Sequence, residues 1–266
     1  MKALTFRVRF FTAQFKIHTQ KLTRRSYLIP PPSAVTGFFG AVLGLPREVL
    51  YYKSDNILAG AELLRFEGRA VSLSRIFKID RSAESLSRLL SDYYKLLELS
   101  EKKRKEVIKD IQGLLTIKED EMLYMPEYKF AVASTDDMLI ERGFKKLKNL
   151  DFEYDVFGGN DYHFVEYIGD VKLAKVIKTT SGRGYCRCSD LDHIEANEFT
   201  IIKNVTSAIA YRPLVIPAPF HENGTYEDYV QVYGADIVTR RALDAVDDGE
   251  SKIFVYKVRP FIAVRI

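Results

Sequence analysis

The sequence predicts an α+β fold in which a βαββαβ unit with a helical insertion precedes a β-rich region. Residues 3–11 alternate apolar and polar side chains, as a half-buried strand does. Residues 82–118 carry apolar side chains at helical spacing. Beyond residue 151, short apolar runs are divided by turn sequences such as FGGN, ENGT and DDGE. We therefore expect a ferredoxin-like or RRM-like domain over residues 1–150, with its insertion at about 82–118, and a β-rich domain over residues 151–266.

The first strand leads through a polar, basic segment to a helix that follows three prolines. Arg7 and Arg9 lie on the strand face opposite the apolar residues. Residues just before prolines avoid the α region, so the chain up to Pro32 must be extended. Ser33 stands where an N-cap would, and the spacing predicts a helix over residues 34–45.

Four further segments complete the first 150 residues. Residues 61–79 alternate again, with a bend or turn at Gly68. The insertion is expected to contain two helices. Residues 128–134 are expected to form another strand, and residues 136–148 a short helix or turn with a basic end.

Composition excludes several classes of function. The net charge of +4 needs no explanation beyond solubility. Cys186 and Cys188 lack the further ligands that a tetrahedral zinc site needs, and no P-loop, dinucleotide fingerprint or acidic metal cluster is present. We expect no cofactor and no metal. Without a signal peptide or a membrane span, and with reduced cysteines, a cytoplasmic location is expected.

Three glycines weaken the expected helix by ~1 kcal/mol each relative to alanine. Gly37, Gly40 and Gly44 share one face, which would let a backbone approach closely. That backbone would belong either to the protein's own sheet or to a phosphate chain. Free N–H groups after Ser33 would suit an anion.

Two segments resemble a known family. YLIPPPSAVTGFFGAVLGL, at residues 27–45, resembles the signature that follows the first strand in the Cas-five family of CRISPR-associated RAMP proteins. FGGNDYHFVEYIGD, at residues 157–170, resembles that family's glycine-bearing segment. The order, spacing and chain length also suit the family.

The resemblance implies a noncatalytic subunit of a Cascade-like interference complex, in an archaeal or thermophilic type I antiviral system. Such a subunit binds the 5′ handle of the crRNA and caps the filament of backbone subunits. The implied partners are crRNA, backbone subunits of the Cas-seven type and the large subunit. Target DNA would be met only through the complex, and no membrane partner is implied.

Basic residues near aromatic rings indicate where RNA would bind. The first strand, the basic loop and the following strand are expected to bring their cations to one surface, with Tyr27 and Phe11 as stacking rings. SGRGYCRC, at residues 181–188, would be either a phosphate-binding nest or a hairpin turn. Taken singly, each cation also fits a solvated surface position. The candidate RNA-binding residues are Arg7, Arg9, Lys21, Arg24, Arg25, Tyr27, Ser33, Thr36, Gly37, Arg75, Lys78, Lys145, Lys146, Arg183 and Arg187.

Two alternatives remain open. Some members of the family cut crRNA precursors without metal, and His18 in the basic loop is the first candidate for that chemistry. No histidine here stands in the compact Lys-His pair that the cleaving branch uses, which favours a noncatalytic protein. The second alternative is an assembly subunit that acts through residues 82–118 and hardly contacts RNA.

Overall fold

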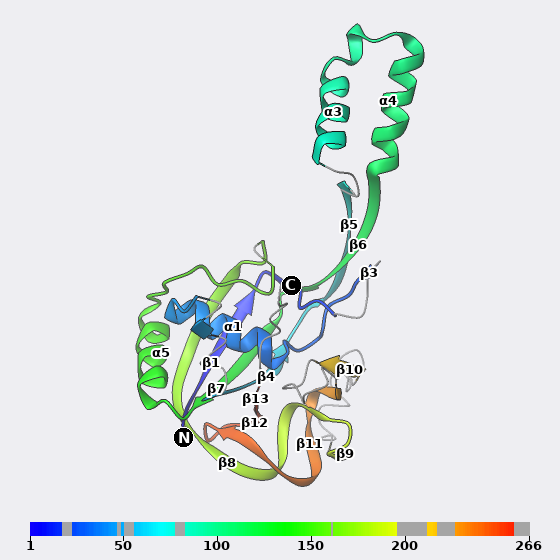
Figure 1. Ribbon diagram of the computed structural model, residues 1–266. Helices are drawn as coiled ribbons and strands as arrows, with labels where there is room; N and C mark the ends of the chain where they lie inside the picture. Colours follow the sequence, from blue (N-terminus) through cyan, green and yellow to red (C-terminus); the bar gives the residue numbers. More distant parts are fainter. Residues whose placement is uncertain are drawn as a thin grey trace. The chain divides into compact units, whose positions relative to one another are not determined.

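The computed structural model (Figure 1) describes residues 1–17, 23–46, 49–50, 56–77, 83–160, 162–195, 212–216 and 227–257. The chain forms two compact units. The larger unit combines residues 1–19, 25–70 and 122–266, and the smaller unit combines residues 20–24 and 71–121.

The larger unit is built on a mixed sheet, to which nine strands contribute within the described residues. Its strand order is β10-β11-β12-β8-β1-β7-β4-β13, and β9 pairs with β11. The strands are β1 Lys2–Phe10, β4 Ile57–Arg65, β7 Glu127–Ser134, β8 Val165–Arg187, β9 Leu191–Glu195, β10 Arg212–Ile216, β11 Glu227–Asp247, β12 Lys252–Phe254 and β13 Tyr256–Lys257.

Four strands, in the order β8-β1-β7-β4, form the centre of this sheet, and their pairings are all antiparallel. The alternation predicted for β1 is confirmed, because its four apolar side chains from Leu4 to Phe10 are fully buried. β8 is long enough to pair with β1 at one end and with β11 over the rest of its length. The predicted strand at residues 128–134 corresponds to β7, which also includes Glu127.

Two helices cover one face of the central strands (Figure 1): α1, Pro32–Leu43, and α5, Asp137–Asn149. Phe6 of β1 stacks on Phe38 of α1 at 6.0 Å between ring centroids. Phe39 of α1 occupies the space that a side chain at Gly143 of α5 would need, so the two helices pack closely. Aromatic packing between helix and strand therefore forms the main core.

The opposite face of the sheet is partly covered by the C-terminal strands. Small residues of β1 and β7, including Ala3 and Ala131, pack against Val246, Ile253 and Val255. A second apolar layer thus lies beneath the turn that joins β11 to β12. The C-terminal strands thus cover part of the sheet face on which Arg7 and Arg9 lie, so less of that face is exposed than the sequence indicates.

Helix α1 begins two residues earlier than predicted. Its N-cap is Pro31 and Pro32 is its first residue, so the expectation that Ser33 is the N-cap was wrong. Proline suits this position because its fixed φ is already helical and its missing N–H is not needed there. The helix ends at Leu43, and Gly44 adopts a left-handed conformation with φ 67°.

The chain before α1 is held inside the core. The Tyr128 hydroxyl donates to the Leu28 carbonyl at 3.0 Å. The buried Gln231 side chain clamps Ile29, accepting from its N–H at 3.0 Å and donating to its carbonyl at 2.6 Å. Side chains from β7 and β11 therefore satisfy the backbone that the proline run leaves without regular partners.

The smaller unit contains a helical hairpin on a short sheet. Its elements are β3 Thr23–Arg24, α3 Ala83–Tyr94, the 3-10 helix η2 Leu96–Glu98, α4 Glu101–Leu114, and most of β5 Gly68–Phe77 and β6 Leu115–Tyr124. Leu89 and Val107 form its small buried core. Both helices fall within residues 82–118, but residues 115–118 already belong to β6. The domain boundary near residue 150 stays a prediction.

Two further findings concern individual segments. In the larger unit, β2, Thr12–Ala13, pairs with the end of β6. Residues 181–187 continue β8, so the expectation of a turn there was wrong. The carbonyl of Ala61 occupies the place of a side chain at Gly184, where φ is 99°. Gly184 thus allows β8 to pass close to β4 rather than to reverse.

Candidate nucleic-acid interface

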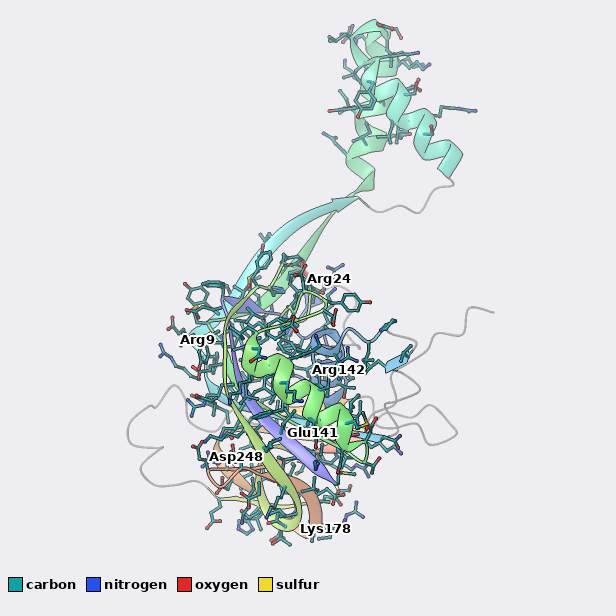
Figure 2. The ribbon with its side chains drawn as sticks, turned by 90° about the vertical axis from the view of Figure 1, so that its left-hand side faces the viewer. Arg9, Arg24, Glu141, Arg142, Lys178 and Asp248 are labelled. Atoms are coloured by element: carbon teal, nitrogen blue, oxygen red, sulfur yellow. The ribbon has the colours of Figure 1, made fainter. Side chains whose placement is uncertain are left out.

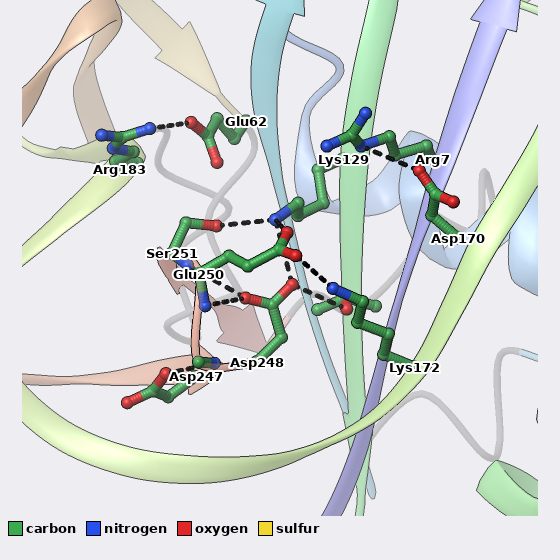
Figure 3. Close-up of polar contacts among 12 residues, drawn as sticks. Arg7, Glu62, Lys129, Asp170, Lys172, Arg183, Asp247, Asp248, Glu250 and Ser251 are labelled. Carbon is green, nitrogen blue, oxygen red and sulfur yellow. Dashed lines mark hydrogen bonds and ion pairs between the residues drawn. The ribbon is translucent and has the colours of Figure 1, made fainter.

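Arg7 and Arg9 lie on the sheet face opposite the helices, as predicted, but both are ion-paired. Arg9 is labelled in Figure 2, and Figure 3 draws the pair of Arg7 with Asp170. Arg9 Nε lies 2.6 Å from Glu166 Oε2, and Arg7 Nε lies 3.3 Å from Asp170 Oδ2. Glu127 approaches both guanidinium groups, at 4.0 Å from Arg7 and 3.7 Å from Arg9. Two cations thus share three carboxylates, so this patch has no excess positive charge.

Lys129, the register partner of Arg7 on β7, is the centre of a second network on this face (Figure 3). Its ammonium lies 3.0 Å from Asp248 Oδ2 and 3.1 Å from Glu250 Oε2, and it donates to Ser251 Oγ at 3.2 Å. Lys172 bonds the other oxygen of Glu250. This network joins β7 and β8 to the turn at residues 247–251. The sequence predicts a turn at DDGE, residues 247–250, but does not reveal this partner.

Asp248 is charged over the whole physiological range. Burial raises its pKa, but hydrogen bonds from the Ser251 amide, the Lys129 ammonium and the Glu250 amide outweigh this effect and bring the pKa to about 2. The Thr5 hydroxyl also donates to it, at 3.1 Å. Four donors from three parts of the chain therefore stabilise one carboxylate.

Arg183 and Arg187, near the end of β8, are also bonded within the protein. Arg183 lies 2.7 Å from Glu62 and 2.7 Å from Asp236. Burial lowers the pKa of Arg183, but the hydrogen bonds and charges of these two carboxylates outweigh it and raise the pKa. Arg187 Nε lies 3.3 Å from the Tyr229 hydroxyl. The nest expected on a flexible turn is therefore absent from this described strand.

The start of α1 offers fewer free donors than expected. The amides of Ala34 and Val35 both donate to the Pro31 carbonyl, at 2.9 and 3.2 Å. Pro32 has no N–H. Among the amides of residues 33–35, therefore, only that of Ser33 has no partner in these hydrogen bonds. Thr36 is buried, whereas Gly37 faces open space.

The two candidate stacking rings differ in access. Tyr27 is fully buried, so it presents no face to a base. Phe11 is 51% exposed and remains available. The sequence could not separate the two, because both follow basic residues near the ends of expected elements.

Two of the candidate cations in the larger unit keep accessible charge. Arg25 is exposed on a short ribbon, where its carbonyl accepts from the Ile17 amide at 3.0 Å. Lys145 is exposed on α5. Neither has an ion pair with any described residue. The neighbouring Lys146 is bonded to Asp151 at 3.3 Å and to Glu153 at 2.9 Å, so its charge is neutralised locally.

The remaining candidates belong to the smaller unit or lie outside the described residues. Arg24 on β3 pairs with Asp120 of β6 at 3.5 Å. Arg75 belongs to β5, of which the structure describes only the backbone at that residue. Lys21, Lys78 and the alternative catalytic residue His18 lie outside the described residues.

The FGGNDY segment packs against residues 12–15. The Gln14 amide donates to the Gly158 carbonyl at 2.8 Å, and the Asn160 side chain donates to Gln14 Oε1 at 2.7 Å. His163 is buried, with its Nδ1 2.7 Å from the Thr12 hydroxyl. Its imidazole is thus a structural link between two segments.

Two other chemical possibilities are limited by the same structure. No set of three or more His, Cys, Asp or Glu residues in the described ranges is arranged to hold a metal ion. Burial raises the pKa of the Cys186 thiol to about 12, so this thiol is not a reactive thiolate at neutral pH.

In the described part of the chain, no helix is both long and apolar enough to cross a membrane.

Comparison with known proteins gives consistent results. The model of a family described as CRISPR-associated protein (Cas_Cas5) matches residues 3–190. A crystal structure of a CRISPR protein from Archaeoglobus fulgidus is 12% identical, covers 97% of this chain and 100% of that chain, and has a TM-score of 0.51. A chain of a CRISPR RNA-guided surveillance complex is 12% identical, with 90% and 91% of the chains covered and a TM-score of 0.45. No curated protein matches. At such identities the structural likeness supports the fold alone.

Proposed function

Because the chain belongs to the CRISPR-associated Cas5 family, as the match over residues 3–190 shows, we propose that it is a noncatalytic RNA-binding subunit of a type I CRISPR interference complex. In this proposal it holds the 5′ handle of the crRNA and caps a filament of Cas-seven-type backbone subunits. The large subunit is a further partner, target DNA is met only through the complex, and the setting is cytoplasmic.

The family match is the observation that carries this proposal, and the fold supports it. The central strands run in the order β8-β1-β7-β4 with antiparallel pairings. α1 follows β1 and α5 follows β7 in the chain. That order supports the ferredoxin-like arrangement expected from the sequence, which is common among RNA-binding modules.

The accessible cations suggest how RNA would be held. Arg25 and Lys145 keep charges that no described carboxylate neutralises, so each can contact a phosphate without breaking an ion pair. Arg7, Arg9 and Arg183 would first have to exchange a carboxylate for the phosphate. We therefore expect the first two residues to contribute more to affinity.

The direct test is co-expression with the neighbouring subunits and the CRISPR repeat transcript, followed by purification. We expect a defined short RNA and a backbone subunit to co-purify. The isolated protein should then bind the repeat-derived 5′ handle more tightly than a scrambled RNA of the same length. An RNA-free monomer without partners at low salt would contradict the proposal.

One observation favours the assembly alternative. Leu90, Tyr93, Tyr94 and Leu97 are 43%, 48%, 85% and 89% exposed, at spacing i, i+3, i+4 and i+7 along α3 and η2. This is the spacing with which a helix places its apolar anchors in a partner's groove. Exposed leucine and tyrosine at these positions are not explained by the small core of the hairpin.

The alternative can be separated from RNA binding. If the hairpin is an assembly surface, Leu97→Ser should weaken co-purification with the partner subunits and leave handle-RNA affinity unchanged. Glu98→Ser changes the adjacent exposed side chain and is the matched control. Equal co-purification of both variants with the partners would remove the alternative.

A further inference from the structure

Three segments of the larger unit meet beside the end of β1. Residues 11–12 lie between residues 124–125 and residues 162–164. The Phe11 amide donates to the Phe164 carbonyl at 3.1 Å, and Thr12 is the register partner of Tyr124. Each segment carries a half-exposed ring. The exposed fractions are 51% for Phe11, 49% for Tyr124, 56% for Tyr162 and 59% for Phe164.

The backbones that carry these rings are fixed by buried contacts. His163, between two of the rings in sequence, is buried and bonded to the Thr12 hydroxyl at 2.7 Å. The ring of Phe157 meets that of Phe164 edge-on at 5.8 Å between centroids. The rings are thus exposed on a rigid base rather than on a free loop, which lowers the entropy cost of binding a partner.

We propose that these four rings, the aromatic cluster, form a stacking surface for unpaired bases of single-stranded RNA. Single-stranded nucleic acids bind where exposed rings accompany cations, because every base has a π face that stacks on an aromatic side chain. This inference rests on the proposed function and adds where, and through which residues, the bases would be held.

The chemistry of the surroundings favours bases over a protein partner. The exposed apolar side chains of the cluster are all aromatic. By contrast, the exposed apolar residues of α3 and η2 include the leucines Leu90 and Leu97. Arg9, two residues before Phe11, lies 5.7 Å from the ring centre of Tyr167. Arg25 is exposed on the ribbon that continues from residue 12. A strand stacked on the cluster could therefore pair a phosphate with Arg25, whereas Arg9 would first have to exchange Glu166 for the phosphate.

The test replaces rings while keeping apolar bulk. In a double variant, Phe11→Leu with Phe164→Leu, affinity for labelled oligoadenylate should fall about tenfold or more, because each base–ring stack is lost. Affinity for double-stranded RNA of the same length should be unchanged, because paired bases are not available for stacking. Fluorescence anisotropy measures both affinities, and thermal unfolding checks that the variant folds like the wild type.

Two further variants make the result specific. Phe11→Tyr with Phe164→Tyr keeps both rings and should retain the wild-type affinity. Tyr94→Leu removes an exposed ring of the smaller unit, outside the cluster, and should leave the affinity unchanged. The slope of affinity against salt should be the same in the leucine variant and the wild type, because no phosphate contact is removed.

The outcomes separate this inference from the proposed function. If the wild type binds handle RNA and oligoadenylate and the leucine variant binds equally well, the aromatic cluster is not a base-stacking surface, while the proposed function stands. If the wild type binds neither RNA at low salt, both the base-stacking inference and the proposed function are contradicted. If the leucine variant keeps RNA affinity but loses a protein partner on co-purification, the cluster is a protein interface and the inference is overturned.

Discussion

The Lys129 ammonium lies 3.0 Å from the Asp248 carboxylate, and the two side chains are only 6% and 1% exposed. This ion pair connects a central strand of the sheet to the turn between β11 and β12, 119 residues away in the chain. A buried pair of this kind adds little compared with apolar residues of the same shape. Removing one partner alone is costly, because the remaining charge is left buried.

Asp248→Ala should therefore destabilise the protein by about 3–5 kcal/mol, as measured by urea unfolding. The control is Glu250→Ala, which removes a carboxylate from the same network. Glu250 is half-exposed, and exposed pairs are worth about 1 kcal/mol or less. Equal losses in the two variants would contradict a buried role for Asp248.

The stability of the protein should also depend on Asp248 in acid. The pKa of this carboxyl is about 2 in the folded protein against an ordinary value of 3.8. A depressed pKa contributes stability above the unfolded value and loses it as pH falls through the folded value. Between about pH 4 and pH 2 the wild type should lose about 2 kcal/mol from this group, and Asp248→Asn should lack that part of the dependence. Urea unfolding at a series of pH values measures it, and parallel curves would argue against the assignment.

The glycines of the α1 segment should respond to alanine with opposite signs. Gly44 has φ 67°, and a Cβ there would lie 2.5 Å from the Glu153 side chain, so Gly44→Ala should cost about 1–2 kcal/mol. Gly37 lies inside the helix with open space around it, so Gly37→Ala should add about 0.5–1 kcal/mol. Thermal unfolding of both variants decides this, and a destabilised Gly37→Ala would show that a backbone approaches that face.

The clamp on Ile29 can be tested by removing its amide group. Gln231→Leu leaves the buried N–H and carbonyl of Ile29 without their partner, and should cost about 2–4 kcal/mol in free energy of unfolding. Gln112→Leu makes the same chemical change at an exposed position of α4 and should be near neutral. A neutral Gln231→Leu would mean that the proline run is held by packing alone.

The proposed phosphate contacts predict a specific dependence on salt. Affinity for handle RNA should fall steeply with salt, and Arg25→Gln should reduce the slope of log affinity against log salt by about 0.7. Lys146→Gln should leave the slope unchanged, because its charge is already bonded to Asp151 and Glu153. Anisotropy titrations at several salt concentrations compare the two. A binding signal independent of salt would contradict phosphate neutralisation.

Much of the central fold could be predicted because its cause is local. The alternation in residues 3–11 places Arg7 and Arg9 opposite a buried face, as the structure has them. The start of α1 was misplaced because proline at position 32 competes with Ser33 for the first turn. Residues 181–187 were mistaken for a turn because Gly184 serves a close contact with Ala61 and Gly182 one with Lys252, which no local pattern reveals.

The candidate site could be predicted less well from the sequence than the fold. A sequence displays cations but not their partners, and here the partners are distant. Arg9 meets Glu166 across 157 residues and Arg183 meets Glu62 across 121. Tyr27 and Phe11 are chemically similar, yet only the tertiary packing decides that one is buried and the other exposed. The aromatic cluster likewise exists only because three separate segments lie side by side.

The position of β1 at the centre of the sheet has a consequence for synthesis on the ribosome. Its first residues pair with residues 127–134 and 165–175, both far downstream. At translation speeds of about 5–20 residues per second, the nascent chain waits on the order of 10–30 s between making β1 and making its last partner. Until residues 127–134 are made, the four large apolar side chains of β1 have no partner strand to join. β1 is thus made long before the two strands that complete its pairing, and its apolar face is open to chaperones in that interval.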